Sequence, residues 1–362
     1  MADRAGYILW MTLIADSLNT FFTHDYDCVI DVRSPAEFAE DRVPGAINLP
    51  VLDNEERAQV GTIYKQESPF KARKIGAALV FRNAAAHIAG PLAHHHGGWR
   101  PLVYCWRGGQ RSGAFTWMLR EIGWRAEVVQ GGYKTYRRLV TRALYDNALP
   151  HRLIQLGGYT GTAKTALLPR LAERGIQALD LEGLARHRGS LLGEMPGGQP
   201  AQKGFESDLI RALNALDPAS PVVVEAESSK IGQINLPPAL WDAMKIAPWI
   251  EITAPVEARA RYLAEAYADI LADGPRLSEM LAPLRFYRGH ELVDRWGTMI
   301  AAGERLALCR SLAEDHYDPA YRTSMRAQAP RFIHREETTA LTPRALDALA
   351  DRLAVHLQTI RI

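Results

Sequence analysis

The chain has 362 residues, of which 47% are hydrophobic, 23% charged and 8% aromatic. These ordinary proportions exclude a disordered, collagenous or coiled-coil protein, and the length suggests two domains that each bury a core. The net charge of +2 identifies no partner by itself. Three cysteines, Cys28, Cys105 and Cys309, are too few for a disulfide framework, which favours a reducing compartment.

An apolar run over residues 5–15 follows Arg4. It is shorter than the roughly 20 apolar residues that span a bilayer, and no small-residue cleavage site follows it after Asp16. We therefore expect a buried first strand or helix, or a translation start at Met11, and no membrane segment. The protein is expected to be cytoplasmic.

Short apolar runs alternate with helical patterns in the first part of the chain, which predicts a parallel-sheet α/β domain over residues 1–145. The expected elements of this domain are strands over 26–32, 101–106 and 126–130 and helices over 112–123 and 133–144. A polar stretch that contains Pro150, residues 146–152, is expected to be a linker.

A second α/β pattern begins after this linker and predicts another domain over residues 153–254. Its expected strands are residues 153–158, 221–227 and 247–253. From residue 255 to residue 362, apolar residues recur at three- and four-residue spacing. This spacing predicts a helical C-terminal region that packs with the second α/β domain.

Several residues that could carry chemistry are interpreted as structural. Cys28 lies inside an apolar strand pattern, and Cys309 lies in a helical one. The triplet His94–His96 lies in a Gly-rich stretch without further ligands nearby, which favours a solvated loop over a metal site. We expect no metal site built from these residues.

The most informative segment is Cys105–Ser112, which follows a predicted strand and precedes a predicted helix. Backbone N–H groups at such a junction point inward and stabilise a thiolate, so the pKa of Cys105 should lie below about 8.5. Arg107 and Arg111 add positive charge, and we predict that they and Cys105 are catalytic. The other residues of this thiol loop are Trp106, Gly108, Gly109, Gln110 and Ser112. Both glycines are expected to supply φ values that the loop needs.

Two segments near the N-terminus resemble the rhodanese family. Asp31–Phe38 and Val43–Asn48 are similar to its D-V-R-x-x-x-E-F and I-P-G-A-x-N signatures. Five residues separate Cys105 from Arg111, whereas ordinary sulfurtransferases of this family have four. The wider spacing is also that of arsenate reductases and of phosphatases that work through a cysteinyl phosphate. It suits a phosphate or a selenium-bearing anion.

Residues 158–165 match the P-loop template G-x4-G-K-[ST] except at Ala163, and they stand between a predicted strand and a predicted helix. In that template backbone N–H groups hold phosphates, Lys164 contacts the terminal phosphate and Thr165 could hold a magnesium ion. If Ala163 keeps a positive φ, it costs about 1 kcal/mol. The predicted diphosphate-binding residues are Gly158, Thr160, Gly161, Lys164 and Thr165.

Two further pairs of residues form a candidate second site in the same domain. Glu225 and Glu227 follow an apolar run where a P-loop fold places a magnesium- or water-orienting carboxylate, or they are solvated acids at a strand end. Arg188 and Ser190 could bind phosphate, or they could cap the next helix. The sequence favours neither interpretation in either pair.

The combination of a C-x5-R thiol loop and a P-loop in one chain resembles the tRNA 2-selenouridine synthase family. The resemblance extends from Asp31 to about Pro248, with a further short segment near the C-terminus. It includes Asn54–Arg57, Val60–Gln66, Gly131–Lys134, Asp180–Ser190 and Tyr317–Pro319. Where that family usually carries E-D-E-x-R-x-I-G, this chain has E-A-E-S-S-K-I-G at Glu225–Gly232.

The resemblance implies a transferase that replaces sulfur by selenium in the wobble 2-thiouridine of tRNA. A geranyl group from geranyl diphosphate would first be placed on the sulfur, and selenium from selenophosphate would then displace the geranylated sulfur. It implies tRNA as the partner, these two small molecules as substrates, no tightly bound cofactor and no stable protein partner. Residues 100–142 hold nine Lys/Arg and two Glu, a net of +7 that suits tRNA.

Two other functions stay open from the sequence. One is a C-x5-R cysteine phosphatase or an arsenate-reductase-like domain fused to a nucleotide-dependent kinase. The other is a non-catalytic tRNA-binding module with a degenerate P-loop, for which Ala163 is the only sign.

Overall fold

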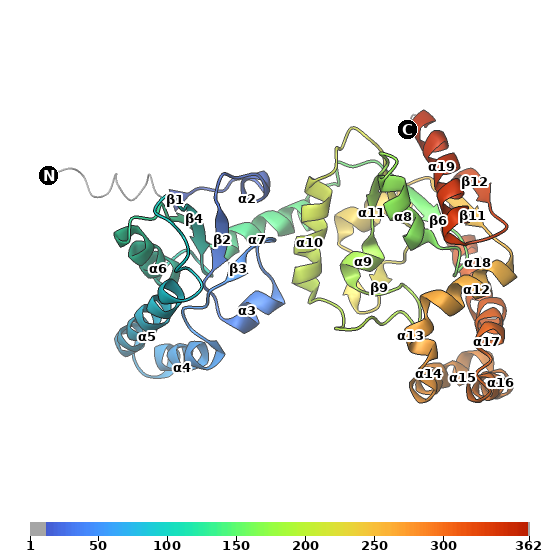
Figure 1. Cartoon of the computed structure of the whole chain (residues 1–362), viewed down its shortest axis with the longest axis horizontal. Coiled ribbons are helices and arrows are strands. Elements are labelled where there is room, and N and C mark those ends of the chain that lie inside the picture. The colour runs from blue at the N-terminus through green and yellow to red at the C-terminus, as the bar shows by residue number, and fades with distance from the viewer. Residues whose placement is uncertain (1–11, 361–362) are drawn as a thin grey trace. The chain divides into compact units, whose positions relative to one another are not determined.

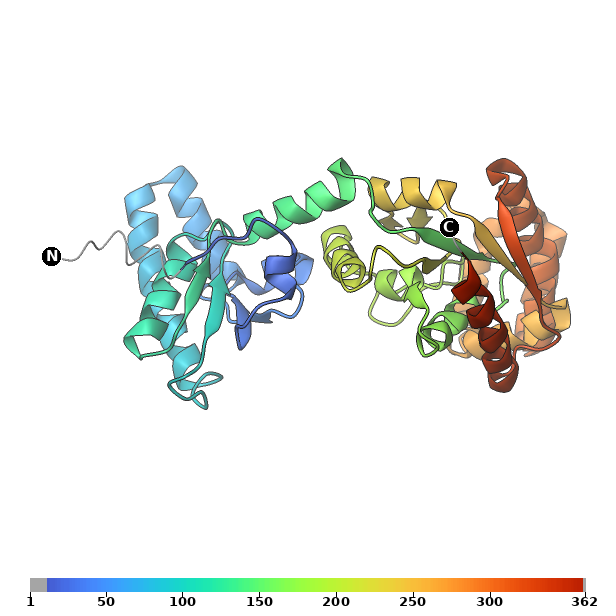
Figure 2. The same cartoon turned by 90° about the horizontal axis from the view of Figure 1, so that it is seen from above.

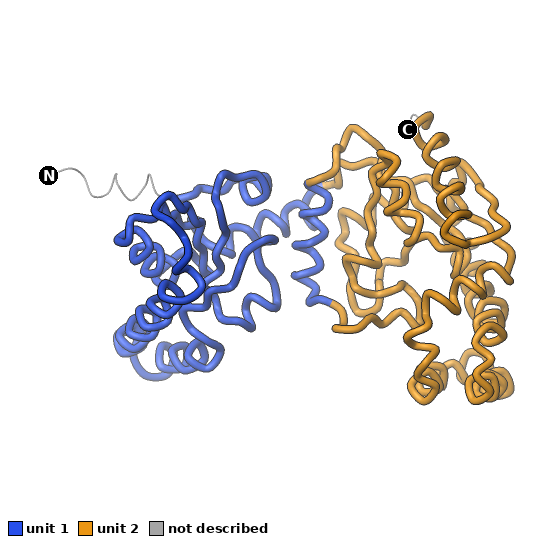
Figure 3. Tube along the Cα trace, viewed as in Figure 1, with its two compact units in different colours: residues 1–147, 200–214 blue, residues 148–199, 215–362 orange. Residues whose placement is uncertain are grey.

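The computed structural model describes residues 12–360, which divide into two compact units (Figure 3). Within the described residues, unit 1 comprises the chain up to Asn147 together with Pro200–Asn214, and unit 2 comprises Ala148–Gln199 together with the chain from Ala215. Residues 200–214 thus belong to unit 1, although the sequence analysis includes them in the range of the second α/β domain.

Figures 1 and 2 show the chain in two views, with the elements labelled in the first. The sheet of unit 1 has five parallel strands in the order β1-β5-β4-β2-β3. Its strands are β1 (Thr12–Leu13), β2 (Cys28–Asp31), β3 (Ile47–Asn48), β4 (Pro101–Tyr104) and β5 (Glu127–Val129). The central strand β4 is buried along its whole length, because helices cover both faces of a parallel sheet. The expected parallel α/β organisation is confirmed.

Strand β1 comes from the N-terminal apolar run. The described part of that run is residues 12–15, and residues 5–11, including the expected alternative start at Met11, lie outside the described residues. Within the described part of the chain, no helix is long and apolar enough to cross a membrane.

Helices follow the strands of unit 1. They are α2 (Asn19–Phe22), α3 (Pro35–Glu40), α4 (Asn54–Gln66), α5 (Pro69–Ala89), α6 (Gln110–Glu121), α7 (Tyr133–Thr141) with the π-helical turn η1 (Arg142–Asp146), and α10 (Gln202–Asn214). The pair α4–α5, which no sequence pattern predicted, is a helical hairpin inserted before β4. Asp53 caps α4 by accepting from the Glu56 N–H, and Ser68 caps α5.

The sheet of unit 2 also has five parallel strands, in the order β12-β11-β6-β8-β7. They are β6 (Leu153–Gly157), β7 (Gln177–Leu179), β8 (Val222–Glu225), β11 (Trp249–Thr253) and β12 (Phe332–Glu337). A short antiparallel pair is formed by β9 (Lys230–Ile231) and β10 (Ile234–Asn235). The middle strand β6 is buried throughout, so the loop that follows it starts from a rigid position.

Strand β12 corrects the expectation that the chain after residue 255 is helical. It pairs in parallel with β11 at the edge of the sheet. Three of its six side chains are charged and none is fully buried, since one side of an edge strand has no neighbouring strand. A short polar segment between long amphipathic helices gave no strand signal in the sequence.

The rest of the C-terminal region is helical, as expected. The helices of unit 2 are α8 (Lys164–Ala172), α9 (Leu181–Ala185), α11 (Pro238–Ile246), α12 (Val256–Ala266), α13 (Ala268–Leu271), α14 (Gly274–Leu281), η2 (Ala282–Leu284), α15 (Arg285–Arg288), α16 (His290–Ala301), α17 (Arg305–Ser311), the π-helical η3 (Leu312–Tyr317), α18 (Asp318–Gln328) and α19 (Pro343–Thr359).

The last helix, α19, belongs to the core of unit 2. Its buried residues Leu349 and Leu353 pack in one cluster with Leu156 of β6, Leu167 of α8 and Ile252 of β11. Burying leucines in this way contributes roughly 1.5–3 kcal/mol for each side chain. This packing holds the central strand β6 and the first helix after it in place.

Candidate active sites in the two units

The thiol loop lies where the sequence predicted it, between β4 and α6. Cys105 directly follows β4 and is 3% exposed, and Gln110 is the first residue of α6. The Ser112 hydroxyl, one turn into that helix, donates to Cys105 Sγ at 3.2 Å. The carboxyl end of a central parallel strand and the N-terminus of a helix therefore meet at the sulfur.

Several groups around Cys105 favour its thiolate form. Burial alone would raise the pKa of this thiol, but the hydrogen bond from Ser112, the charge of Arg111 and the backbone N–H groups of Ser112 and Gly109 hold it below its ordinary value. This is the direction that the loop sequence predicts. The geometry is consistent with a nucleophilic role for Cys105, which remains a prediction.

Close backbone contacts shape the loop. Gly108 has a φ of +63°, and a Cβ there would come within 2.6 Å of the Val129 carbonyl oxygen. Gly132 has a φ of +59°, and a Cβ there would come within 2.2 Å of the Cys105 carbonyl oxygen. The N–H of Tyr133 also donates to that carbonyl, at 2.8 Å. The Gly131–Lys134 motif therefore packs against the thiol loop.

The structure corrects one expectation about this loop. Gly109 has a φ of −103°, so it does not supply the positive φ that Gly108 supplies. Trp106 is half-buried with its ring 5.2 Å from that of Tyr133, and Arg107 is exposed. Gln110 is exposed as well.

Arg111 is held in place by Glu37, a residue of the D-V-R-x-x-x-E-F segment. Arg111 Nη1 lies 3.0 Å from Glu37 Oε2, and the Ser34 N–H donates to the same oxygen at 3.1 Å. Burial would raise the pKa of Glu37, but Arg111 and Ser34 hold it below its ordinary value. Glu37 thus positions Arg111. In the sequence it stands out only as one residue of a family signature.

The phosphate loop has the backbone conformation of its template. Gly158 and Gly161 have φ of +146° and +86°, and the departing residue Ala163 adopts a left-handed conformation with φ +60° and ψ +30°. Ala163 thus has the positive φ for which the sequence analysis gives a cost of about 1 kcal/mol. Lys164 Nζ donates to the Gly158 carbonyl at 3.0 Å, so the lysine lies across the loop.

A group of carboxyl side chains lies beside the end of the phosphate loop. The Thr165 hydroxyl donates to Glu182 Oε2 at 2.7 Å. The N–H groups of Leu181 and Glu182 donate to Glu225 Oε2 at 2.9 and 3.1 Å, so Glu225 caps α9. Burial and the nearby charge of Glu182 raise the pKa of Glu225 to about 8 and raise that of Glu227 strongly. Glu225 is therefore not a solvated acid, and Glu182 is a site residue that the sequence did not single out.

A cavity of about 570 Å³ opens at the phosphate loop of unit 2. Its polar side contains the predicted residues Thr160, Gly161, Lys164, Thr165, Arg188, Ser190 and Glu227. Its apolar side is formed by Leu191, Met195, Tyr262, Leu263, Ala266, Tyr267 and Tyr317. Ser190 Oγ lies 3.0 Å from Tyr267 Oη, and Arg188 pairs with Asp269 at 2.9 Å. The cavity thus combines a phosphate-binding loop with an apolar wall.

The Tyr317–Pro319 motif also acts at this cavity. Tyr317 lines it, and the next residue, Asp318, binds both terminal nitrogens of Arg259 at 2.8 Å. Arg259 in turn donates to the Thr160 carbonyl of the phosphate loop at 3.2 Å. The motif therefore connects the C-terminal helical region with the phosphate loop, a role that its spacing in the sequence could not indicate.

The basic segment 100–142 is only partly available to a partner. Arg137 pairs with the buried Glu206 and lies 3.9 Å from Asp41. Lys134, Arg138 and Arg142 are exposed and spaced by four residues along α7 and η1, so they lie along one face. These three cations, and not Arg137, present a basic surface.

No group of three or more His, Cys, Asp or Glu side chains within residues 12–360 is placed to hold a metal ion. Thr165 and Glu182 offer oxygen donors of the kind that Mg²⁺ takes together with phosphate oxygens. Glu225 Oε1, behind them, finds no hydrogen-bond partner among the described residues.

Comparison with known proteins identifies a family for each unit. Residues 15–139 match the model of the rhodanese-like domain, and residues 151–278 match that of the tRNA 2-selenouridine synthase AAA domain. The chain is similar to three curated proteins named tRNA 2-selenouridine synthase. The protein of Alcanivorax borkumensis is 36% identical to this chain, and the match covers 81% of this chain and 88% of the relative. The protein of Aeromonas salmonicida is 34% identical, with 91% of this chain and 95% of the relative covered. The protein of Cupriavidus pinatubonensis is 33% identical, with 87% of this chain and 93% of the relative covered. The chain belongs to the tRNA 2-selenouridine synthase family.

Proposed function

We propose that the chain is a transferase that replaces the sulfur of wobble 2-thiouridine in tRNA by selenium, in a geranylation step followed by a selenation step. Its relatives are named for selenouridine synthesis in tRNA. A tRNA substrate supports a cytoplasmic location for the reaction. The observation that carries the two-step form is the unit 2 cavity, which joins a phosphate-binding loop to an apolar wall.

The first step is assigned to this cavity. Geranyl diphosphate needs cationic and N–H donors for its diphosphate and an apolar surface for its ten-carbon chain, and the two sides of the cavity supply them. The thiocarbonyl sulfur attacks C1 of the geranyl group, the S–C bond forms and the C–O bond breaks. Diphosphate leaves with the electron pair, and N3 of the base loses its proton. Lys164 stabilises the charge that develops on the leaving diphosphate.

A magnesium ion, when bound, would add positive charge at the diphosphate, and Thr165 and Glu182 are the residues that would hold it. The neighbouring carboxyl groups are buried, and burial disfavours their negative charge unless a cation lies beside them. The same oxygen donors therefore suit a cation that arrives together with the phosphates.

The second step is assigned to the thiol loop of unit 1. Its N–H groups and Arg111 hold the oxygens of selenophosphate, and the Cys105 thiolate attacks phosphorus. The P–Se bond breaks with its electron pair on selenium, and the released hydrogen selenide ion attacks C2 of the geranylated base. The C2–S bond breaks and geranylthiolate leaves, taking up a proton. Water then hydrolyses the S-phosphocysteine and releases phosphate. The five-residue spacing to Arg111, shared with enzymes that form a cysteinyl phosphate, supports this assignment.

Mass spectrometry of nucleosides from 2-thiouridine tRNA tests the proposal. The wild-type protein with geranyl diphosphate and selenophosphate should convert thiouridine to selenouridine through a geranylated nucleoside. Lys164→Ala should slow the geranyl step at least about 100-fold, because a transition-state charge loses its partner. Lys245→Ala, at an exposed position on α11, is the matched control.

Three outcomes would contradict the assignment. Geranylation at the normal rate by Lys164→Ala would show that the P-loop does not hold the diphosphate. Selenouridine formed without geranyl diphosphate would remove the first step. Release of phosphate from aryl phosphates, without any change in tRNA, would favour the phosphatase alternative.

A further inference from the structure

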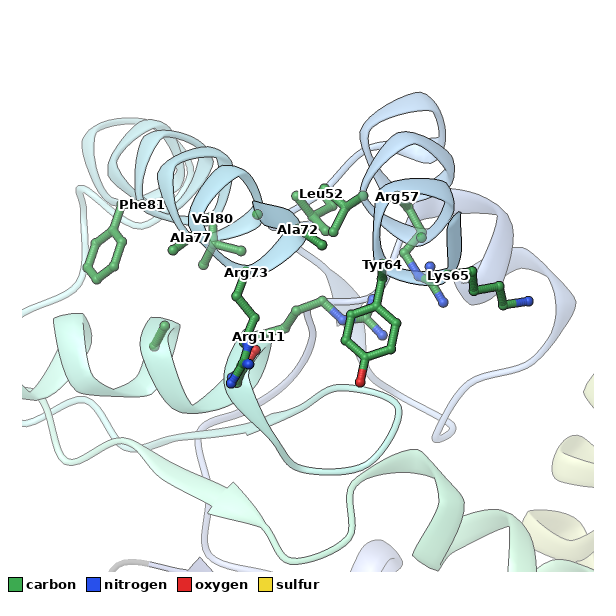
Figure 4. A pocket seen from close by; sticks show the side chains of 15 residues that line it. Leu52, Arg57, Tyr64, Lys65, Ala72, Arg73, Ala77, Val80, Phe81 and Arg111 are labelled. Carbon is green, nitrogen blue, oxygen red and sulfur yellow. The ribbon is translucent and has the colours of Figure 1, made fainter. Parts of the chain in front are cut away.

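A second cavity, of about 640 Å³, lies in unit 1 between the α4–α5 hairpin and α6, and no step above uses it. Figure 4 shows its apolar side chains Ala77, Val80 and Phe81 on α5 and the Tyr64 ring on α4. Leu52 and Ala72 also contribute to its apolar surface. A cavity of this size and lining is typical of a site for an apolar group of small-molecule size.

The charged residues that line this cavity are all basic. Arg57, Lys65, Arg73 and Arg111 line it, and none of the other lining residues is acidic. In Figure 4 the side chains of Arg73 and Arg111 lie below the apolar side chains of α5. Glu37 contacts Arg111 at 3.0 Å and Arg57 at 3.9 Å, which leaves the surroundings of the cavity positive. The ligand that suits such a cavity has an apolar group attached to a polyanion.

The cavity is continuous with the thiol loop. Gln110 and Arg111 line the cavity and belong to the loop, and the charge of Arg111 acts on the Cys105 thiolate. An apolar group bound in the cavity would therefore lie next to the thiol loop. Two species in the proposed reaction combine an apolar chain with phosphates, geranyl diphosphate and the S-geranylated base of tRNA. Only the S-geranylated base takes part in the selenation step at the thiol loop, which the cavity borders.

We propose that the cavity binds the geranyl chain of the S-geranylated intermediate and so directs C2 of the base to the thiol loop. This inference rests on the proposed function. The basic residues that line the cavity bind phosphates that flank the base. Burial of the geranyl chain distinguishes the intermediate from unmodified 2-thiouridine. The hairpin α4–α5 thereby makes the selenation step specific for RNA that has completed the first step.

Binding of three synthetic anticodon stem-loops to the full chain tests this. They carry 2-thiouridine, its S-methyl derivative and its S-geranyl derivative, and the readout is fluorescence anisotropy. The S-geranyl RNA should bind at least about tenfold more tightly than the S-methyl RNA, which corresponds to about 1.4 kcal/mol. Ala77→Trp should abolish this preference, because the indole fills the cavity.

Ala78→Trp is the matched control. Ala77 and Ala78 are both exposed on α5, but only Ala77 lines the cavity. Both variants should unfold at the same temperature, and Ala78→Trp should keep the tenfold preference. If Ala77→Trp keeps it too, the cavity does not bind the geranyl chain. If Leu191→Arg in the unit 2 cavity removes the preference instead, the chain stays in unit 2 and the proposal is wrong.

Supplying the S-geranyl RNA with selenophosphate separates this inference from the proposed function, since it bypasses the first step. Ala77→Trp should convert the S-geranyl RNA at least about tenfold more slowly than Ala78→Trp at RNA concentrations below saturation. Failure of the wild-type protein to convert the RNA would contradict the proposed function itself. Equal rates for the two variants, with conversion by the wild-type protein, would contradict only the role of the cavity.

Discussion

The surroundings of Cys105 favour the negatively charged thiolate, whereas those of the other two cysteines favour the neutral thiol. Burial and the neighbouring Asp27 raise the pKa of Cys28, and burial raises the pKa of Cys309 to about 11. At Cys105 the Ser112 hydroxyl and Arg111 overcome the effect of burial. At a given pH the fraction of thiolate is therefore higher at Cys105 than at Cys28 or Cys309.

This difference predicts selective alkylation. Iodoacetamide at pH 7 should modify Cys105 faster than Cys28 or Cys309, and the rate for Cys105 should reach half its plateau below the pKa of an ordinary thiol. Because Arg111 lowers the pKa, Arg111→Gln should move that midpoint to higher pH. Peptide mass spectrometry over a pH series measures both rates. An unchanged midpoint in Arg111→Gln would show that this arginine does not activate the thiol.

Ala163 is a second residue whose effect can be measured. Its left-handed conformation costs about 1–2 kcal/mol, which glycine would remove. Glycine would also add about 0.5–1 kcal/mol of backbone entropy cost and lose a buried methyl group worth about 0.8 kcal/mol. We therefore expect Ala163→Gly to change the free energy of unfolding by less than about 1 kcal/mol in urea titration. A change above about 2 kcal/mol in either direction would contradict this account of the P-loop.

At the scale of elements, α7 has two distinct sides. Arg137 points to the buried Glu206 of α10 and holds the two helices of unit 1 together. Lys134 and Arg138 face solvent. We therefore expect Arg137 to stabilise the fold of unit 1 and Arg138 to be available to a partner.

The exposed side of α7 predicts a salt-dependent interaction with tRNA. Reversing Lys134, Arg138 and Arg142 to Glu should reduce the slope of log K against log salt, by about 0.9 for each phosphate that the protein no longer neutralises. Filter binding of tRNA from 50 to 200 mM salt measures the slope. An unchanged slope would place the tRNA-binding surface elsewhere in the chain.

Arg137→Glu provides the contrast. It leaves Glu206 and Asp41 without their cation, so it should destabilise unit 1 by about 3 kcal/mol or more. Chemical denaturation followed by circular dichroism tests this. Full stability of Arg137→Glu would show that the pair with Glu206 is not formed in solution.

At the scale of the whole molecule, each unit carries one candidate site at the carboxyl ends of its parallel strands. The thiol loop follows β4 in unit 1, and the phosphate loop follows β6 in unit 2. In both cases a loop enters a helix N-terminus, which is where open α/β sheets bind anions. The two proposed steps therefore use separate side chains.

The separation predicts the behaviour of Cys105→Ser. The variant should fold, bind tRNA and form the geranylated nucleoside, because the diphosphate site is intact. It should form no selenouridine, since a serine hydroxyl is a far poorer nucleophile near neutral pH. A time course of thio-, geranylthio- and seleno-nucleosides follows the reaction. Normal selenouridine formation would exclude Cys105 from selenium transfer, and loss of both steps would mean that they share one site.

The sequence by itself determined the two parallel α/β units and the position of both loops. Cys105–Ser112 and residues 158–165 each stand between an apolar strand and a helix, and local backbone preferences suffice to form such junctions. These features depend on residues that are close together along the chain. The sign of φ at Ala163 stayed open in the sequence, and its left-handed conformation is a finding of the structure.

Only the tertiary structure decided which distant side chains complete the sites. Glu37 reaches Arg111, Glu182 reaches Thr165, and Asp318 holds the phosphate loop through Arg259. Strand β12 and helix α10 likewise found their places by pairing and packing with partners far away in the sequence. Periodicity and motif spacing report local conformation, whereas these interactions depend on how helices and strands pack in three dimensions.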